Sequence, residues 1–179
     1  MALRTSSPVP IASVAPPPGG GADTPLAVPY RSQKPFLNLC WAACCQMVFE
    51  YYGRVVQLCQ VAATVYGAHC CDNLATCDRA TWPETVYSQP IWHFKWQRID
   101  RPFTFGNIEF EINAGRPIHA YYQWAGGGSH VAVVSGYYSN GDVEVLDPLF
   151  GQGRLSYRYV FGAYGHGAWS KSYFQLEPQ

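Results

Sequence analysis

With 179 residues, the chain is long enough for one domain with its own hydrophobic core and too short for two of ordinary size. Its formal net charge is zero, with 12 basic and 12 acidic residues, so no broad electrostatic field favours nucleic acid or an anionic membrane. No segment reaches the roughly 20 apolar residues of a membrane span, and the N-terminus lacks a recognisable secretory signal peptide. We therefore expect a monomer with no nucleic-acid and no membrane partner.

The first 26 residues differ in composition from the rest of the chain. They are rich in Pro, Gly, Ser and Ala and show no periodic apolar pattern. We predict that residues 1–26 form a disordered leader or linker, and that residues 27–179 form the folded domain. The alternative for the leader is a segment removed during maturation, by another protease or by the protein itself.

Three helices are predicted in the first two thirds of the chain. Residues 40–52 are mostly small or apolar and contain no Gly or Pro before Gly53, which predicts a helix that ends at this glycine. Asn38 precedes it at a position where a side-chain oxygen can cap free amides. Apolar residues at helical spacing predict further helices over residues 57–66 and 104–114.

From Pro117 onward the apolar pattern changes to alternation, which is typical of strands. Strands are predicted over residues 118–124, 129–138, 142–146 and 168–176. Ser139-Asn140-Gly141 supplies a hairpin turn between the second and third of these. Helices followed by an antiparallel sheet indicate the α+β class.

Cys40 is the best candidate for a catalytic nucleophile among the seven cysteines. Catalysis by cysteine needs a thiolate, which positive potential at a helix N-terminus or beside an imidazolium stabilises. Cys40 opens the first predicted helix, where unpaired amides and the helix dipole favour an anion. Cys44 and Cys45 lie one turn deeper, so we interpret them as buried thiols or disulfide partners.

A base and its orienting partner are found on predicted strands. His130 follows the glycine run at 126–128, and Asp147 comes 17 residues later, after the hairpin turn. Such a hairpin brings the carboxylate beside the imidazole, as the third member of a triad requires. Gln33, upstream of Cys40, is a candidate oxyanion-hole donor. The alternatives are an ordinary strand histidine for His130 and a turn-starting Asp-Pro for Asp147.

Several short motifs together resemble the papain-like cysteine proteases that include secreted effectors of plant-pathogenic bacteria. The resemblance spans roughly residues 28 to 176 and rests on these segments: Val28-Pro29-Tyr30, Gln33, Cys40-Trp41-Ala42-Ala43, Gln46-Met47-Val48, Tyr51-Tyr52-Gly53, Gly115-Arg116-Pro117, the run Gly128-Ser129-His130-Val131-Ala132-Val133-Val134-Ser135-Gly136-Tyr137, and Asp147-Pro148.

This resemblance implies a two-lobed papain-like fold. An N-terminal helical lobe and a C-terminal antiparallel β-sheet lobe would enclose the active site in the cleft between them. It implies a triad of Cys40, His130 and Asp147 with Gln33 at the oxyanion hole, and no cofactor or metal. The expected function is a cysteine endopeptidase that acts on a protein or peptide substrate, as an effector or toxin secreted or delivered into a target cell. An inhibitory (immunity) protein that protects the producing cell is an expected partner.

Two other functions fit the same residues. An acyl-transferring relative, such as a transglutaminase or deamidase, uses Cys, His and Asp in the same chain order. A catalytically silent peptide-binding module would keep the fold without the chemistry. Amine adducts would identify the first, and failure of an epoxide inhibitor to label Cys40 would identify the second.

Four further cysteines form a group around the second predicted helix and the loop after it. The first interpretation is two disulfides among Cys59, Cys70, Cys71 and Cys77. If one of the seven cysteines is the nucleophile, six remain, and an even number that can pair in disulfides favours an oxidising environment. A zinc site with some of these ligands and free buried thiols are the alternatives. The aromatic residues Trp92, Phe94 and Trp96 are interpreted as packing residues, with a substrate pocket as the alternative.

Overall fold

The structure is a computed structural model that describes residues 19–179. Most of the expected leader, residues 1–18, lies outside the described residues. Residues 19–26, which we expected to be disordered, contact the domain instead: the Gly20 amide donates to the Ile112 carbonyl at 2.9 Å. A Cβ on Gly136 would lie 2.7 Å from Pro25, so this glycine lets the segment pack closely. The packed part of the chain therefore begins before residue 27.

One lobe is a six-stranded sheet in which every neighbouring pair is antiparallel. The strand order is β1-β6-β2-β3-β4-β5. The strands are β1 (Phe94–Ile99), β2 (Ile118–Trp124), β3 (Ser129–Tyr137), β4 (Asp142–Asp147), β5 (Gly151–Ser156) and β6 (Gly167–Pro178). The predicted turn joins β3 to β4, with Gly141 at a φ of 88°.

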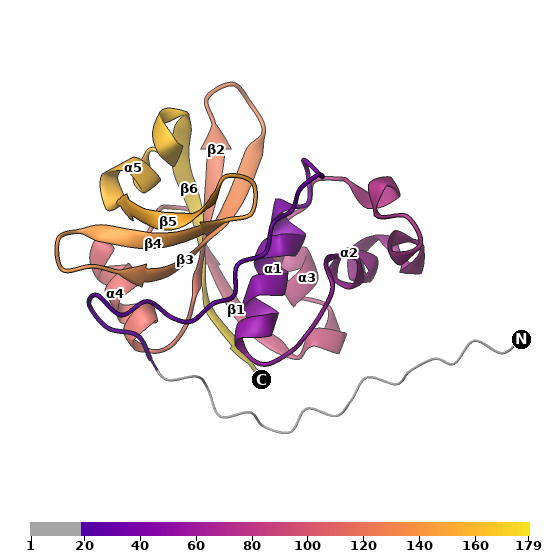
Figure 1. The fold of residues 1–179 in the computed structure, drawn as a ribbon, viewed down its shortest axis with the longest axis horizontal. Coiled ribbons are helices and arrows are strands. Elements are labelled where there is room, and N and C mark those ends of the chain that lie inside the picture. The colour runs from indigo at the N-terminus through magenta and orange to yellow at the C-terminus, as the bar shows by residue number, and fades with distance from the viewer. Residues whose placement is uncertain (1–18) are drawn as a thin grey trace, which may run out of the picture.

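The helices are divided between the two lobes. Figure 1 shows α1, α2 and α3 together beside the sheet, whereas α4 and α5 lie with the sheet lobe. The helices are α1 (Cys40–Tyr51), α2 (Leu58–Tyr66), α3 (Pro83–Tyr87), α4 (Phe105–Asn113) and α5 (Tyr157–Phe161), with short 3-10 turns η1 (Ala68–Cys71), η2 (Leu74–Cys77), η3 (Pro90–Trp92) and η4 (Ala163–Gly165). The predicted α+β, two-lobed architecture is confirmed. Among residues 19–179, no helix has the length and apolar character needed to cross a bilayer.

Helix α1 runs through the core rather than along the surface. Every residue from Cys40 to Phe49 is buried, as expected of a helix that is apolar around its whole circumference. Gly53, at a φ of 79°, follows its C-terminal end. The prediction that Asn38 caps this helix is wrong: Leu39 is the N-cap residue and no side chain caps it. The Asn38 side chain donates instead to the Asp78 carbonyl, at 3.2 Å.

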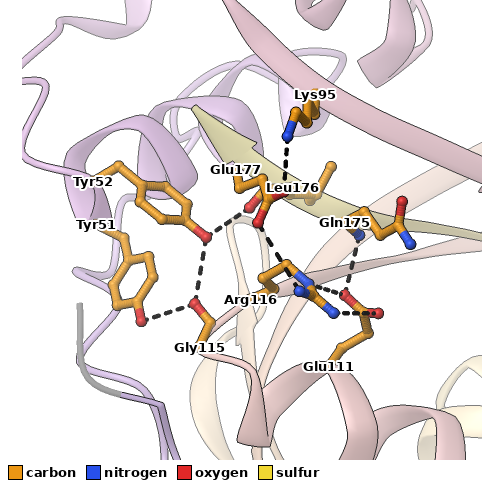
Figure 2. A network of polar contacts seen from close by, with 9 residues as sticks. All are labelled: Tyr51, Tyr52, Lys95, Glu111, Gly115, Arg116, Gln175, Leu176 and Glu177. Carbon is orange, nitrogen blue, oxygen red and sulfur yellow. Dashed lines mark hydrogen bonds and ion pairs between the residues drawn. The ribbon is translucent and has the colours of Figure 1, made fainter. Parts of the chain in front are cut away.

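The C-terminal end of α1 is tied to the sheet lobe by tyrosine hydroxyls (Figure 2). Tyr51 donates to the Gly115 carbonyl at 3.0 Å, and Tyr52 donates to the Leu176 carbonyl at 2.7 Å. Because these contacts fix one end of α1, they also fix the direction in which its other end, with Cys40, meets the sheet.

A buried ion pair extends the same network. The Arg116 Nε donates to Glu111 Oε2 at 2.7 Å, and its Nη2 donates to Glu111 Oε1 at 3.1 Å (Figure 2). The Gln175 backbone amide also donates to Glu111 Oε2, at 3.1 Å. The Glu111 side chain is only 3% exposed, and these charge-assisted bonds offset the cost of removing it from water.

Candidate active site

Cys40 is the first residue of α1 and is 9% exposed. Because no side chain caps the helix, the amides of its first turn are not occupied by a capping group. The free cysteines Cys44 and Cys45 are fully buried. Burial, the largest cause, raises the pKa of both thiols well above the ordinary value. Of the three free cysteines, Cys40 alone therefore has access to solvent.

The predicted hairpin brings His130 and Asp147 together. His130 lies near the start of β3 and Asp147 at the end of β4, the strand paired with it. The His130 Nε2 lies 2.8 Å from Asp147 Oδ1, and both side chains are 3% exposed. Because Nε2 faces the carboxylate, Nδ1 is the ring nitrogen left for another partner.

Asp147 is held by donors from three directions. Its Oδ1 also accepts from the backbone amides of Leu149, at 2.9 Å, and Phe150, at 3.0 Å. Its Oδ2 accepts from the Tyr164 hydroxyl at 2.9 Å. Tyr164 lies in η4 with a φ of 59°, a conformation that is uncommon for a residue with a side chain. The carboxyl group is thus fixed in orientation by these hydrogen bonds.

The electrostatic surroundings of His130 favour the protonated ring. Burial acts to lower the pKa of the imidazole, but hydrogen bonds with Asp147 and with Cys40, and the charges of the same two groups, raise the pKa to about 9. Both groups therefore act on the protonation of this imidazole, and Asp147 lies within hydrogen-bond distance of it, at 2.8 Å.

Aromatic rings fix the plane of the imidazole. Trp124 stacks on His130 with ring centroids 5.7 Å apart, and Tyr122 lies parallel to it at 6.4 Å. Phe150 meets the ring edge to face at 5.7 Å. These residues were assigned no role in the site from the sequence, although the alternation of side chains along the predicted strands would have placed two of them on the same face as His130. Tyr122 pairs directly with His130 across β2 and β3, and Trp124 shares the same face of β2.

Gln33 is fully buried, and its segment lies beside the turn after Asp147. Its backbone amide donates to the Pro148 carbonyl at 2.9 Å, and its Nε2 donates to the Phe36 carbonyl at 3.0 Å. Within the described residues, its Oε1 has no hydrogen-bond partner. One N–H of the side-chain amide thus remains unassigned.

A cavity of about 610 Å³ opens on the side of Asp147 that faces β5 and η4. Its walls are largely apolar and include Trp124, Phe150, Leu155 and Tyr164. Phe150 is 65% exposed. By contrast, Trp92 and Phe94 are buried and pack against Phe49, which agrees with their interpretation as core residues.

The four cysteines of the helical lobe are paired. Cys59 lies at disulfide distance from Cys71, and Cys70 from Cys77. His69, Cys70 and Cys77 are also close enough together to share a metal ion. A cystine sulfur is a poor ligand because metals bind the thiolate, so the paired cysteines leave His69 alone as a donor. The residues do not fit a zinc site in this state.

A two-lobed α+β fold, with a buried helix that begins at a cysteine and a histidine–aspartate pair on the sheet, is the architecture of a papain-like cysteine protease. Solved structures agree with this fold. The crystal structure of a double glycine motif protease from an AMS/PCAT transporter, in complex with the leader peptide, is 15% identical. The match covers 90% of this chain and 99% of that one, with a TM-score of 0.60.

Two further solved structures are similar, with lower TM-scores. The peptidase domain of Streptococcus ComA, a bifunctional ABC transporter involved in quorum sensing, is 15% identical; coverage is 85% of this chain and 99% of that chain, with a TM-score of 0.59. The Pseudomonas avirulence protein AvrPphB is 11% identical, with coverage of 78% and 92% and a TM-score of 0.43. No curated protein matches the sequence closely enough to count as a relative.

The model of the family described as "Peptidase_C39 like family" matches residues 25–177. The chain belongs to this family. It is a papain-like cysteine protease, and the match covers nearly all of the residues that form the two lobes.

Proposed function

We propose that the protein hydrolyses peptide bonds with Cys40 as nucleophile, His130 as acid and base, and Asp147 as the residue that orients the histidine. The main supporting observation is the position of the His130 ring. Asp147 binds its Nε2 at 2.8 Å, and Cys40 contributes to raising the pKa of the same imidazole. A raised imidazole pKa favours the thiolate–imidazolium pair, because the charged ring stabilises the adjacent anion.

The chemistry would proceed in two stages. The Cys40 sulfur attacks the substrate carbonyl carbon, and the His130 imidazolium gives its proton to the leaving amine as the carbon–nitrogen bond breaks. His130 then removes a proton from water, which attacks the acyl-enzyme and releases the carboxylic acid product. The oxyanion of each tetrahedral intermediate would accept hydrogen bonds from the Cys40 amide and from the free N–H of Gln33.

A polypeptide with apolar side chains is the proposed substrate class. The cavity beside Asp147 is apolar and adjoins Trp124 and Phe150, which contact the catalytic imidazole. One structural neighbour is a protease in complex with a leader peptide, which supports a peptide ligand for this fold. We therefore propose that an apolar side chain of the substrate occupies this cavity.

The site of action is proposed to be outside the reducing cytosol of the producing cell. Two cysteine pairs at disulfide distance support this, because such bonds persist in oxidising compartments. A secreted effector or toxin, with an inhibitory protein to protect the producer, follows from the resemblance of the sequence. If so, expression of the wild type but not of Cys40→Ala should be toxic to a target cell, and co-expression of the inhibitor should relieve the effect.

Cleavage of a peptide library would test the catalytic assignment. The library should include apolar and Gly-Gly-containing peptides, and new termini should be identified for the wild type and for Cys40→Ala. Cys45→Ala is a matched control, because it removes a buried thiol of the same helix. We expect new termini with the wild type and with Cys45→Ala, and none with Cys40→Ala. Cleavage that survives in Cys40→Ala would exclude Cys40 as nucleophile.

Two additions to this assay separate the alternatives. A primary amine added to the reaction would give adducts if the enzyme transfers acyl groups, whereas hydrolysis gives only new termini. An epoxide inhibitor should label Cys40 in an active protease. Absence of both cleavage and labelling would favour the silent binding module.

A further inference from the structure

A loop that is distant in sequence holds the segment just before Cys40. The Asn38 backbone amide donates to Asp78 Oδ1 at 2.8 Å, and the Leu37 amide donates to Asp78 Oδ2 at 3.3 Å. In addition, the Asn38 side chain donates to the Asp78 backbone carbonyl at 3.2 Å. One carboxylate therefore fixes two successive peptide groups two and three residues before the cysteine.

The residue after Asp78 contacts the helix itself. The Trp41 indole Nε1 donates to the Arg79 carbonyl at 2.9 Å, and Trp41 is fully buried. The Tyr66 hydroxyl donates to the Ala80 carbonyl at 3.2 Å, which connects the same segment to the end of α2. Residues 78–80 thus join the N-terminal end of α1 to α2.

These contacts leave the helix amides free. Asp78 binds the amides that precede α1, and no side chain caps the helix. An ordinary N-cap side chain would occupy the amides of the first turn, where a thiolate and an oxyanion would need them. Because Asp78 binds the segment before the helix, it fixes the backbone there without competing for the amides of the first turn.

The loop that carries Asp78 has little core of its own. The 3-10 turns η1 and η2 bury only Cys70 and Cys77, which are paired with each other. Cys77 directly precedes Asp78 in the sequence. A cross-link limits the conformations of such a loop where apolar packing cannot. The Cys70–Cys77 bridge therefore ends at the residue next to Asp78.

We propose that Asp78 is a positioning residue for the nucleophile, and that the Cys70–Cys77 disulfide holds it in place. The proposal rests on Cys40 being the catalytic cysteine. Asp78 acts through the backbone of the segment before Cys40, so its loss should displace the thiol relative to the imidazole. Because a shift of about 1 Å can cost about 100-fold in rate, the effect should appear in kcat more than in KM.

Three substitutions test the role of Asp78 in the full chain. Asp78→Ala should lower kcat about 10- to 100-fold with KM changed less than about threefold. Asp78→Asn should be intermediate, because its oxygen can keep the Asn38 amide while its NH₂ group opposes the other amide. Asp72→Asn is the matched control: it neutralises an exposed acid of the same loop and should retain wild-type kinetics. Wild-type kcat in Asp78→Ala would overturn the proposal.

Amide hydrogen exchange gives a readout that does not need turnover. In Asp78→Ala the Leu37 and Asn38 amides should exchange faster, while amides in the middle of β3 keep their protection. Uniform loss of protection would mean a general loss of fold and would overturn a positioning role. If the wild type proves to have no peptidase activity, the proposed function fails, but this exchange pattern still decides whether Asp78 fixes the segment.

The disulfide is tested by paired serine variants. Cys70→Ser with Cys77→Ser should reduce kcat to a similar degree as Asp78→Ala, and combining the three substitutions should add little. Cys59→Ser with Cys71→Ser is the matched control and should affect kcat less. Fully additive effects, or equal losses from both pairs, would overturn the assignment of the Cys70–Cys77 bridge as the support of Asp78.

Discussion

Replacing Asp147 by asparagine would separate the charge of this residue from its hydrogen bonds. Its Oδ1 accepts from the His130 ring and from the backbone amides of Leu149 and Phe150. Those two amides cannot turn away, so asparagine must direct its oxygen toward them, since its NH₂ group would oppose their N–H groups. The Tyr164 hydroxyl can rotate to accept from that NH₂. The imidazole tautomer is therefore preserved and only the negative charge is lost.

The expected magnitude follows from the pKa of His130, which its surroundings raise from 6.5 to about 9. Without the carboxylate charge, burial opposes the remaining effect of Cys40 alone, so the pKa should fall by up to about 2.5 units. A pKa difference of about 2.5 units corresponds to about 3 kcal/mol. At pH values above both pKa values, it lowers the protonated fraction of the His130 ring by up to about 300-fold. We expect Asp147→Asn to lose roughly 100-fold in kcat/KM at pH 8.5, and less than about tenfold at pH 5.5.

The assay is kcat/KM from pH 5 to 10 on a peptide that the wild type cleaves. The high-pH limb should move down by about two units in Asp147→Asn. Asp147→Ala, which loses the acceptor as well as the charge, should lose about 10³-fold or more throughout. If Asp147→Asn is as inactive as Asp147→Ala at every pH, the two backbone amides do not orient the side chain and the reasoning is wrong.

Three further substitutions test other parts of the structure. Tyr164→Phe leaves Asp147 Oδ2 without its hydroxyl donor; it should lower the free energy of unfolding by about 1–3 kcal/mol, measured by urea denaturation, and reduce kcat/KM. Glu111→Gln breaks the buried ion pair with Arg116 and should cost about 3 kcal/mol in the same measurement, while activity at 20 °C is retained; a loss below about 0.5 kcal/mol would contradict it. Leu155→Asp places a charge in the apolar cavity and should raise KM for apolar peptides about tenfold with kcat unchanged, and an unaltered KM would exclude this cavity as a substrate subsite.

The contact between His130 and Asp147 could be predicted because it depends on local signals. The Ser139-Asn140-Gly141 turn sets a hairpin, and strand alternation on either side brings two polar residues together across it. Helix α1 was predictable for a similar reason, since an apolar run without Gly or Pro ends at a glycine. Helix α4 was also predicted from its apolar spacing. In the structure, a capping box formed by Thr104 and Asn107 fixes the start of this helix.

Other parts of the site depend on contacts between segments far apart in the sequence. Tyr164 reaches Asp147 from a short turn with left-handed backbone angles, and no periodic pattern predicts such a turn. Strand β5 was missed because Gly151, Gly153 and polar residues give it little strand propensity. The glycines near residue 20 were interpreted as signs of flexibility, whereas their small size permits close packing.

The two cystines differ in their exposure to solvent, which affects how the protein can be handled. Cys71 is exposed and Cys59 is partly exposed, whereas Cys70 and Cys77 are both fully buried. A mild dithiol in the buffer should therefore open the outer bridge well before the inner one, because thiol–disulfide exchange needs access to a sulfur atom. A range of reductant concentrations should exist in which Cys40 is kept as a thiol while the inner cross-link stays intact, and purification within that range would preserve both.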